Sequence, residues 1–196
     1  MSDDTTRRGP PGAIADQHRE HAEALAAWLP TLERQLPEVA RALVDSLDAG
    51  GKVLICGNGG SAADAQHMAA ELVSRFERER RALHAAALTV DTSALTAIAN
   101  DYSFERVFSR QVEALGRAGD ILVAISTSGR SPNVLAAVET AQRLGMMVLA
   151  LTGTPGEPLH EKATWSLRAP CGRTARVQEL HEFAMHCLCG LVEELL

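Results

Sequence analysis

The sequence lacks a long hydrophobic run. No stretch of its 196 residues approaches the roughly 20 continuous apolar residues that a membrane-spanning helix needs. The polar segment from Met1 to Gly12 also lacks the apolar core of a secretory signal. We therefore expect a cytoplasmic protein with no membrane partner.

Positive charge is in deficit as well. The chain has 19 lysines and arginines against 25 aspartates and glutamates, which gives a formal net charge of -6. Such a chain has no general electrostatic attraction to nucleic acid or to an anionic membrane surface. Nucleic acid is therefore not an expected partner, and any phosphorylated ligand has to be held by local groups.

Cysteine is scarce and shows no metal-binding spacing. The four cysteines are Cys56, Cys171, Cys187 and Cys189, and none of them forms the paired pattern of a zinc knuckle. Cys187 and Cys189 would point to different sides of a helix. We predict four reduced thiols, most of them buried as small apolar residues.

The length and composition fit one globular domain. A chain of 196 residues builds one substantial core, and 46% hydrophobic with 22% charged residues is ordinary for a folded protein. Residues 1–12 contain turn-forming residues without apolar periodicity, so we expect a flexible tail there. The single domain is expected to span residues 13–196.

The hydrophobic pattern predicts an α/β fold. Apolar residues recur at helical spacing over residues 13–29 and 32–47, so we expect two amphipathic N-terminal helices separated at Pro30. Short apolar runs then alternate with helical segments, which is typical of a parallel sheet covered on both faces. The expected architecture is a three-layer sandwich around a five-stranded parallel sheet. Strands are expected at residues 52–56, 85–90, 121–125, 147–151 and 164–169. Helices are expected at residues 61–78, 93–100, 103–115, 132–144 and 174–195.

A glycine-rich turn joins the first predicted strand to the next helix. The chain reads Gly-Asn-Gly-Gly-Ser from Gly57 to Ser61. Glycines let the backbone approach an anion closely, and the free N–H groups of a helix N-terminus favour negative charge. The pattern is neither a dinucleotide fingerprint nor a Walker loop. Taken alone, it fits an anion-binding turn and a plain strand-to-helix turn equally well.

A second segment after a predicted strand is rich in hydroxyl groups. Its four hydroxyl side chains are Ser126, Thr127, Ser128 and Ser131. Hydroxyls at the carboxyl end of a parallel strand can donate hydrogen bonds to phosphate oxygens, in the place where such sheets bind ligands. Helix capping would require only one of them. We therefore predict a phosphate-binding loop.

Two predicted helices carry acidic residues and histidines at a spacing of four. His67 and Glu71 share a face, and Asp64 begins nearly the same stripe one turn earlier. In the last predicted helix the same spacing relates Gln178, Glu182 and His186. Each set alone is compatible with an ordinary surface pair. The first helix, however, begins at the glycine-rich turn, which places Glu71 about two and a half turns from the suspected anion site.

These motifs together resemble one family. The matching strings run from Gly57 to His67 with Glu71, from Ala99 to Asp101, from Ala124 to Gly129, and from Gln178 to Glu179 with His186. They are similar to the sedoheptulose-7-phosphate isomerase, or phosphoheptose isomerase, family, whose members have a sugar isomerase (SIS) domain. The resemblance covers the chain apart from its first dozen residues.

The resemblance implies roles for individual residues. Glu71 and His186 would form the acid/base pair. Members of the family can also bind zinc, and one ion per subunit would be held by His67, Glu71, Gln178 and His186. The family is typically tetrameric, which implies a homotetramer. The implied substrate-binding residues are Asn58, Gly59, Gly60, Ser61, Glu71, Asn100, Asp101, Ser126, Thr127, Ser128, Ser131 and Gln178.

The implied reaction is the aldose–ketose isomerisation of D-sedoheptulose 7-phosphate to D-glycero-D-manno-heptose 7-phosphate, the first step of bacterial heptose biosynthesis. The chain departs from the family pattern at Arg130, where Asn is common, and at Ala175, where some members have Asp; both positions bear on sugar preference. Two alternatives stay open: a non-catalytic phosphosugar-binding or replication-initiator-binding SIS protein, and an isomerase of another phosphosugar. The presence of Glu71 and His186 favours an enzyme, which works either through this metal-free pair or with zinc.

Overall fold

Five parallel strands form one sheet, as the alternating pattern predicts. The computed structural model describes residues 12–196, so the predicted tail lies outside the described residues except for Gly12. The strand order is β2-β1-β3-β4-β5, and every neighbouring pair is parallel. The strands are β1 (Val53–Gly57), β2 (Ala85–Ala87), β3 (Ile121–Ser126), β4 (Met147–Thr152) and β5 (Trp165–Arg168).

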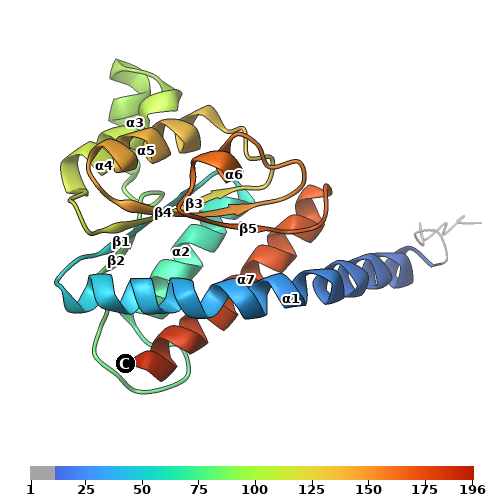
Figure 1. Cartoon of the computed structure of the whole chain (residues 1–196). Coiled ribbons are helices and arrows are strands. Elements are labelled where there is room, and N and C mark those ends of the chain that lie inside the picture. Colours follow the sequence, from blue (N-terminus) through green and yellow to red (C-terminus); the bar gives the residue numbers. More distant parts are fainter. Residues whose placement is uncertain (1–11) are drawn as a thin grey trace, which may run out of the picture.

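Helices cover both faces of the sheet, so the three-layer architecture is confirmed (Figure 1). One face is covered by α1 (Ala13–Asp48), α2 (Gly60–Val73) and α7 (Thr174–Leu195). The other face is covered by α3 (Thr92–Asp101), the 3-10 helix η1 (Phe104–Arg106), α4 (Ser109–Leu115), α5 (Pro132–Arg143) and α6 (Leu159–Lys162). Within residues 12–196, none of these helices combines the length and the apolarity that crossing a bilayer requires.

The strands are apolar on both sides because each side packs against a helical layer. Val53 and Ile55 of β1 belong to the core beneath α1, α2 and α7, while Leu54 and Cys56 belong to the core on the opposite face. This alternation follows from the two-residue period of a strand. It explains why the strands read as continuous hydrophobic runs and not as alternating ones.

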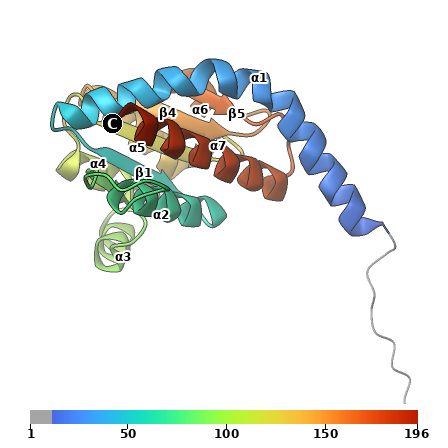
Figure 2. The ribbon, with the colours of Figure 1, turned by 90° about the horizontal axis from the view of Figure 1, so that it is seen from below.

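The prediction of two N-terminal helices is wrong in one respect. Residues 13–48 form a single helix, α1, which continues through Pro30 and Pro37. A proline removes one helical hydrogen bond and favours a kink, but burial of Trp28 and Leu32 on either side of Pro30 keeps both turns on the core. Figure 2 shows that α1 bends along its length and that its N-terminal part extends past the rest of the domain.

Other boundaries shift where tertiary contacts intervene. The helix predicted at residues 61–78 ends at Val73, and the segment predicted at residues 103–115 divides into η1 and α4. The strand predicted at residues 85–90 ends at Ala87, since only three of its residues pair with β1. The short helix α6 was not predicted, because four residues do not display a helical period.

A buried aspartate joins the starts of β1 and β3. Asp120 is 2% exposed, and its Oδ1 accepts a hydrogen bond from the backbone N–H of Lys52 at 2.9 Å. Its Oδ2 accepts one from the backbone N–H of Arg117 at 2.8 Å and pairs with the ammonium group of Lys52. Both carboxylate oxygens are therefore needed as acceptors.

Replacing this carboxylate should destabilise the fold. In Asp120→Asn the amide nitrogen faces a backbone N–H group, so we expect the free energy of unfolding to fall by about 1 to 3 kcal/mol. Urea denaturation measures the change. The control is Asp48→Asn, which removes an exposed ion pair with Arg81 and should change stability by less than about 1 kcal/mol. Equal effects of the two substitutions would contradict the role given to Asp120.

Candidate active site

The strand order creates a crevice between β1 and β3. The chain leaves β1 for β2 on one side, while β3 lies on the other side, so the connections after these two strands run in opposite directions. In open α/β sheets, ligands bind at this kind of switch point, beyond the carboxyl ends of the strands. The glycine-rich turn after β1 and the hydroxyl-rich loop after β3 meet there.

A pocket of about 300 Å³ lies at this switch point. Eight of the predicted substrate-binding residues line it, and they come from the two loops and from α7. Ile125 and Thr174 also line the pocket, although neither was predicted. Thr174 is the first residue of α7 and had no distinctive sequence pattern around it. The lining residues are Asn58, Gly59, Gly60, Ser61, Ile125, Ser126, Thr127, Ser131, Thr174 and Gln178.

The two loops are tied together by a pair of amides. Asn58 Nδ2 donates to Asn133 Oδ1 at 2.8 Å, and Asn133 Nδ2 donates to Asn58 Oδ1 at 2.9 Å. Asn133 is 2% exposed and stands in the first turn of α5. The side chain of Asn58 is therefore used to hold the glycine-rich turn against α5.

Glycine allows a close approach where α2 meets α7. A Cβ atom at Gly60 would lie 2.2 Å from Nε2 of Gln178, so any side chain would displace that amide. The preceding residue, Gly59, has a φ of 57°, in the left-handed region that favours glycine. The turn thus uses glycine for shape at Gly59 and for close approach at Gly60. The close approach at Gly60 is the feature that a plain strand-to-helix turn would not need.

The hydroxyl groups of the second loop are not occupied by helix capping. Ser131 is the N-cap residue of α5 but makes no side-chain capping bond within the described chain. Its Oγ lies instead 2.9 Å from Oγ of Ser126, which is almost fully buried at the end of β3. Both hydroxyls line the pocket. The alternative interpretation of these two residues as simple caps is therefore not supported.

Four predicted substrate-binding residues lie elsewhere: Glu71, described below, and the three exposed residues Ser128, Asn100 and Asp101. Ser128 is exposed, and its Oγ accepts a hydrogen bond from the backbone N–H of Arg130 at 3.2 Å. Asn100 and Asp101 are exposed at the end of α3, where the Asn100 amide donates to the Asp101 carboxylate at 2.8 Å. None of the three lines the pocket of its own chain.

A second group of polar residues lies farther along α2 and α7. His67 Nε2 is 3.0 Å from Glu71 Oε1 and 3.4 Å from His186 Nε2. The Nδ1 atom of His67 pairs with Glu182 Oε1, and His186 Nε2 is 3.6 Å from the same oxygen. These four side chains, partly exposed, form the cluster that we call the His–Glu cluster.

The His–Glu cluster contains three of the four predicted zinc ligands. His67, Glu71 and His186 are present, but Gln178 lies against Gly60 and lines the pocket. Glu182 occupies the position beside the two histidines and was missed as a site residue. Its signal was the four-residue spacing shared with His186. The ligand atoms of His67, Glu182 and His186 lie within 4.8 Å of one another, close enough to converge on one metal ion.

Asp64 stands between the pocket and the His–Glu cluster. Its side chain is 8% exposed, and its Oδ2 has no hydrogen-bond partner within residues 12–196. Burial and the negative charge of Glu182 raise its pKa to about 6, although His67 acts in the opposite direction. The neighbourhood therefore disfavours additional negative charge.

The pocket and the His–Glu cluster belong to one surface because α2 and α7 run in the same direction. Contacts advance together along both helices, from Gly60 with Gln178 to His67 with Glu182 and His186. At 1.5 Å per residue, Gln178 and His186 are about 12 Å apart along α7. A ligand anchored in the pocket can thus extend toward the cluster.

Comparisons with known proteins identify the family of the chain. Residues 18–153 match the model of the SIS domain. The phosphoheptose isomerase 1 of Campylobacter jejuni is 50% identical, and the match covers 92% of this chain and 97% of that protein. The phosphoheptose isomerase of Thiobacillus denitrificans is 53% identical, and the match covers 94% of this chain and 91% of that protein.

Comparison with solved structures identifies the same family. The phosphoheptose isomerase from Neisseria gonorrhoeae has a TM-score of 0.86 and 45% identity, and covers 92% of this chain and 97% of its own. The phosphoheptose isomerase from Francisella tularensis has a TM-score of 0.89 and 41% identity, and covers 92% of this chain and 96% of its own. On this evidence the chain belongs to the SIS domain family and, within it, to the phosphoheptose isomerases.

Proposed function

We propose that the chain is the aldose–ketose isomerase that converts D-sedoheptulose 7-phosphate to D-glycero-D-manno-heptose 7-phosphate, the first step of bacterial heptose biosynthesis. The observation that carries this proposal is the placement of a hydroxyl-lined pocket and a His–Glu cluster along the same two helices. The pocket suits the binding of a phosphate, and the His–Glu cluster suits proton transfer. Relatives named phosphoheptose isomerase at about 50% identity support the same activity.

The reaction needs two proton transfers. One proton moves between C1 and C2 and another between their oxygens, through an enediol. Glu71 is the carboxylate that takes the carbon-bound proton, and His186 is the group that exchanges a proton with the oxygens. His67 lies between them, 3.0 Å from Glu71 Oε1 and 3.4 Å from His186 Nε2. Each transfer by a positioned side chain typically contributes about 10²- to 10⁴-fold in rate.

Removing the proposed base should stop turnover without unfolding the protein. Glu71→Gln keeps the shape of the side chain but cannot accept the proton, so we expect kcat to fall at least about 100-fold. Thermal unfolding should be nearly unchanged, because Glu71 is partly exposed. The matched control is Glu79→Gln on the loop that follows α2, where the side chain is 89% exposed. Wild-type kcat in Glu71→Gln would refute this role.

The phosphate is proposed to bind between the glycine-rich turn and the hydroxyl-rich loop. None of the described residues that line the pocket is cationic, so hydroxyls and backbone N–H groups at the start of α2 supply the hydrogen bonds. Ser131 is well placed for this, because its hydroxyl lines the pocket and caps nothing.

Loss of one pocket hydroxyl should weaken substrate binding. A hydrogen bond to a charged group contributes about 1.5 to 3 kcal/mol, so Ser131→Ala should raise KM for the sugar phosphate about 10- to 150-fold. Ser128→Ala is the matched comparison in the same loop, and its effect should be smaller because Ser128 lies outside the pocket. Steady-state kinetics of both variants provides the measurement. A larger effect in Ser128→Ala would place the phosphate outside this pocket.

Zinc is proposed as the metal of the His–Glu cluster. His67, Glu182 and His186 supply two imidazoles and a carboxylate, a donor set that zinc accepts in catalytic sites. Of the other two ligands that the family pattern implies, Glu71 lies within the cluster, whereas Gln178 lies against Gly60 and lines the pocket. With zinc bound, His67, Glu182 and His186 would serve as its ligands, and the ion would polarise the substrate carbonyl in place of proton exchange by His186.

Metal content should depend on His67, which contacts every other member of the cluster. We expect about one zinc per chain after loading and dialysis, and a loss of most of it in His67→Ala, because a three-ligand set loses a third of its donors. Elemental analysis measures this without reference to activity. His18→Ala on the exposed side of α1 is the control. No retained zinc in the wild type would refute the metal proposal and leave the isomerase proposal standing.

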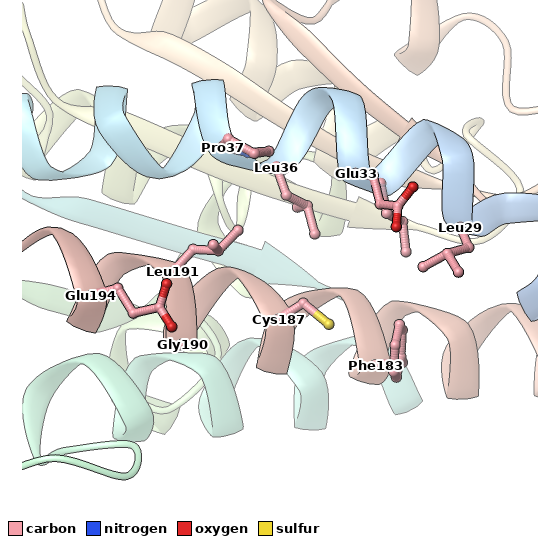
Figure 3. A pocket seen from close by; sticks show the side chains of 10 residues that line it. Leu29, Glu33, Leu36, Pro37, Phe183, Cys187, Gly190, Leu191 and Glu194 are labelled. Atoms are coloured by element: carbon pink, nitrogen blue, oxygen red, sulfur yellow. The ribbon is translucent and has the colours of Figure 1, made fainter.

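A homotetramer in the cytoplasm is the proposed working form. Between α1 and α7 lies a mainly apolar groove of about 450 Å³ that includes Leu29, Leu32, Phe183 and Leu191 (Figure 3). A second copy of the chain is the proposed occupant, and another copy would also bring α3, with Asn100 and Asp101, to a neighbouring pocket. Four free cysteines fit a reducing compartment. Light scattering of the purified chain measures the mass, and a monomer would contradict the tetramer.

A further inference from the structure

The loop between α2 and β2, residues 74–84, is fixed by one buried carboxylate. Glu193 lies near the end of α7, and its side chain is 3% exposed. Its Oε1 accepts a hydrogen bond from the backbone N–H of Phe76 at 2.7 Å, and its Oε2 accepts bonds from those of Glu77 and Arg78, both at 2.9 Å. Burial acts to raise the pKa of Glu193, but these three bonds and Arg80 lower it below its usual value.

Arg80 connects the same loop to the end of α2. Its Nε is 3.3 Å from Glu193 Oε1, and its Nη1 donates to the carbonyl of Leu72 at 2.8 Å. Its Nη2 donates to the carbonyl of Glu71 at 2.6 Å. Carbonyls at a helix C-terminus otherwise lack partners. The loop is thus attached both to α7 and to the turn of α2 that carries the proposed base.

The side chain that this loop presents to the His–Glu cluster is an aromatic ring. Phe76 stacks on the imidazole of His186, with ring centroids 5.4 Å apart and planes inclined by 30°. His67 meets His186 edge-on, with centroids 5.0 Å apart and planes inclined by 74°. The imidazole of His186 therefore has one ring stacked on it and another at its edge.

We propose that Phe76 is a positioning residue for His186, held in place by the Glu193–Arg80 pair. The proposal rests on the isomerase function given above, in which His186 exchanges the proton with the substrate oxygens. The side chain of His186 is 41% exposed, so a ring with so little surrounding packing retains rotamer freedom. Stacking on Phe76 removes part of that freedom before the substrate arrives.

A role limited to core packing would not require this arrangement. Phe76 is only partly buried, yet an ionised carboxylate and a guanidinium are buried to fix the backbone beside it. Burying such a pair costs desolvation free energy, and what the burial provides here is a defined position for a short loop. The ring of that loop lies against the residue whose orientation matters for proton transfer.

The test compares Phe76→Leu with Phe76→Tyr. Leucine fills a similar apolar space but cannot stack, so we expect kcat to fall about 10- to 100-fold from misorientation of His186. KM for the sugar phosphate should stay within about twofold, because the pocket lies two turns away along α7. Tyrosine keeps the stacked ring and should restore kcat. Val112→Ala, in α4 and in the core on the opposite face of the sheet, is the control for lost stability and should leave kcat unchanged.

A second measurement is independent of turnover. In histidine-labelled protein, the ring signals of His186 carry the ring-current shift of a stacked phenylalanine and are assigned by comparison with His186→Gln. We expect Phe76→Leu to abolish this shift and Phe76→Tyr to retain it. Wild-type kcat together with unchanged His186 signals in Phe76→Leu would overturn the proposal. An inactive wild type with the expected signal changes would instead refute the isomerase function and leave the stacking contact established.

Discussion

The close parallel packing of α2 against α7 is the constraint on which the site depends. Because Gly60 has no side chain, the amide of Gln178 comes directly against the first turn of α2. The two helix N-termini then share one pocket, and two turns farther on the same packing brings His67 of α2 against Glu182 and His186 of α7. A single helix–helix packing therefore positions both the proposed anion-binding end and the proposed proton-transfer end.

The charges of the site are separated along these helices. The pocket end has hydroxyls and backbone N–H groups, without a cationic side chain among the described lining residues, whereas the far end gathers Glu71, Glu182 and two histidines. For a chain of net charge -6, a phosphate bound in the pocket as proposed would lie away from the carboxylates. The raised pKa of Asp64, which lies between the two ends, shows how little further negative charge that region accepts.

Most of the fold follows from sequence patterns because burial on both faces makes each strand continuously apolar. The pocket was also predictable, since its residues lie in two short segments directly after strands. Glu182, Thr174 and Phe76 were not predicted, because their roles arise from contacts between α7 and elements distant in sequence. The helix break expected at Pro30 is absent for a related reason. Burial of Trp28 and Leu32 outweighs the tendency of proline to end a helix. Local signals thus identified the elements, and tertiary packing decided their ends and their partners.

The N-terminal part of α1 has a thermodynamic consequence. From Ala13 to Ala27 no residue is fully buried. Ala24 and Leu25 pack partly against the core, and α7 adds polar contacts such as those of Arg176 with Gln17. A helical segment of about 15 residues is marginal in water without a packed face. Its order depends on few contacts, so this end of α1 should open locally at a free-energy cost well below that of global unfolding and should exchange its amide hydrogens first.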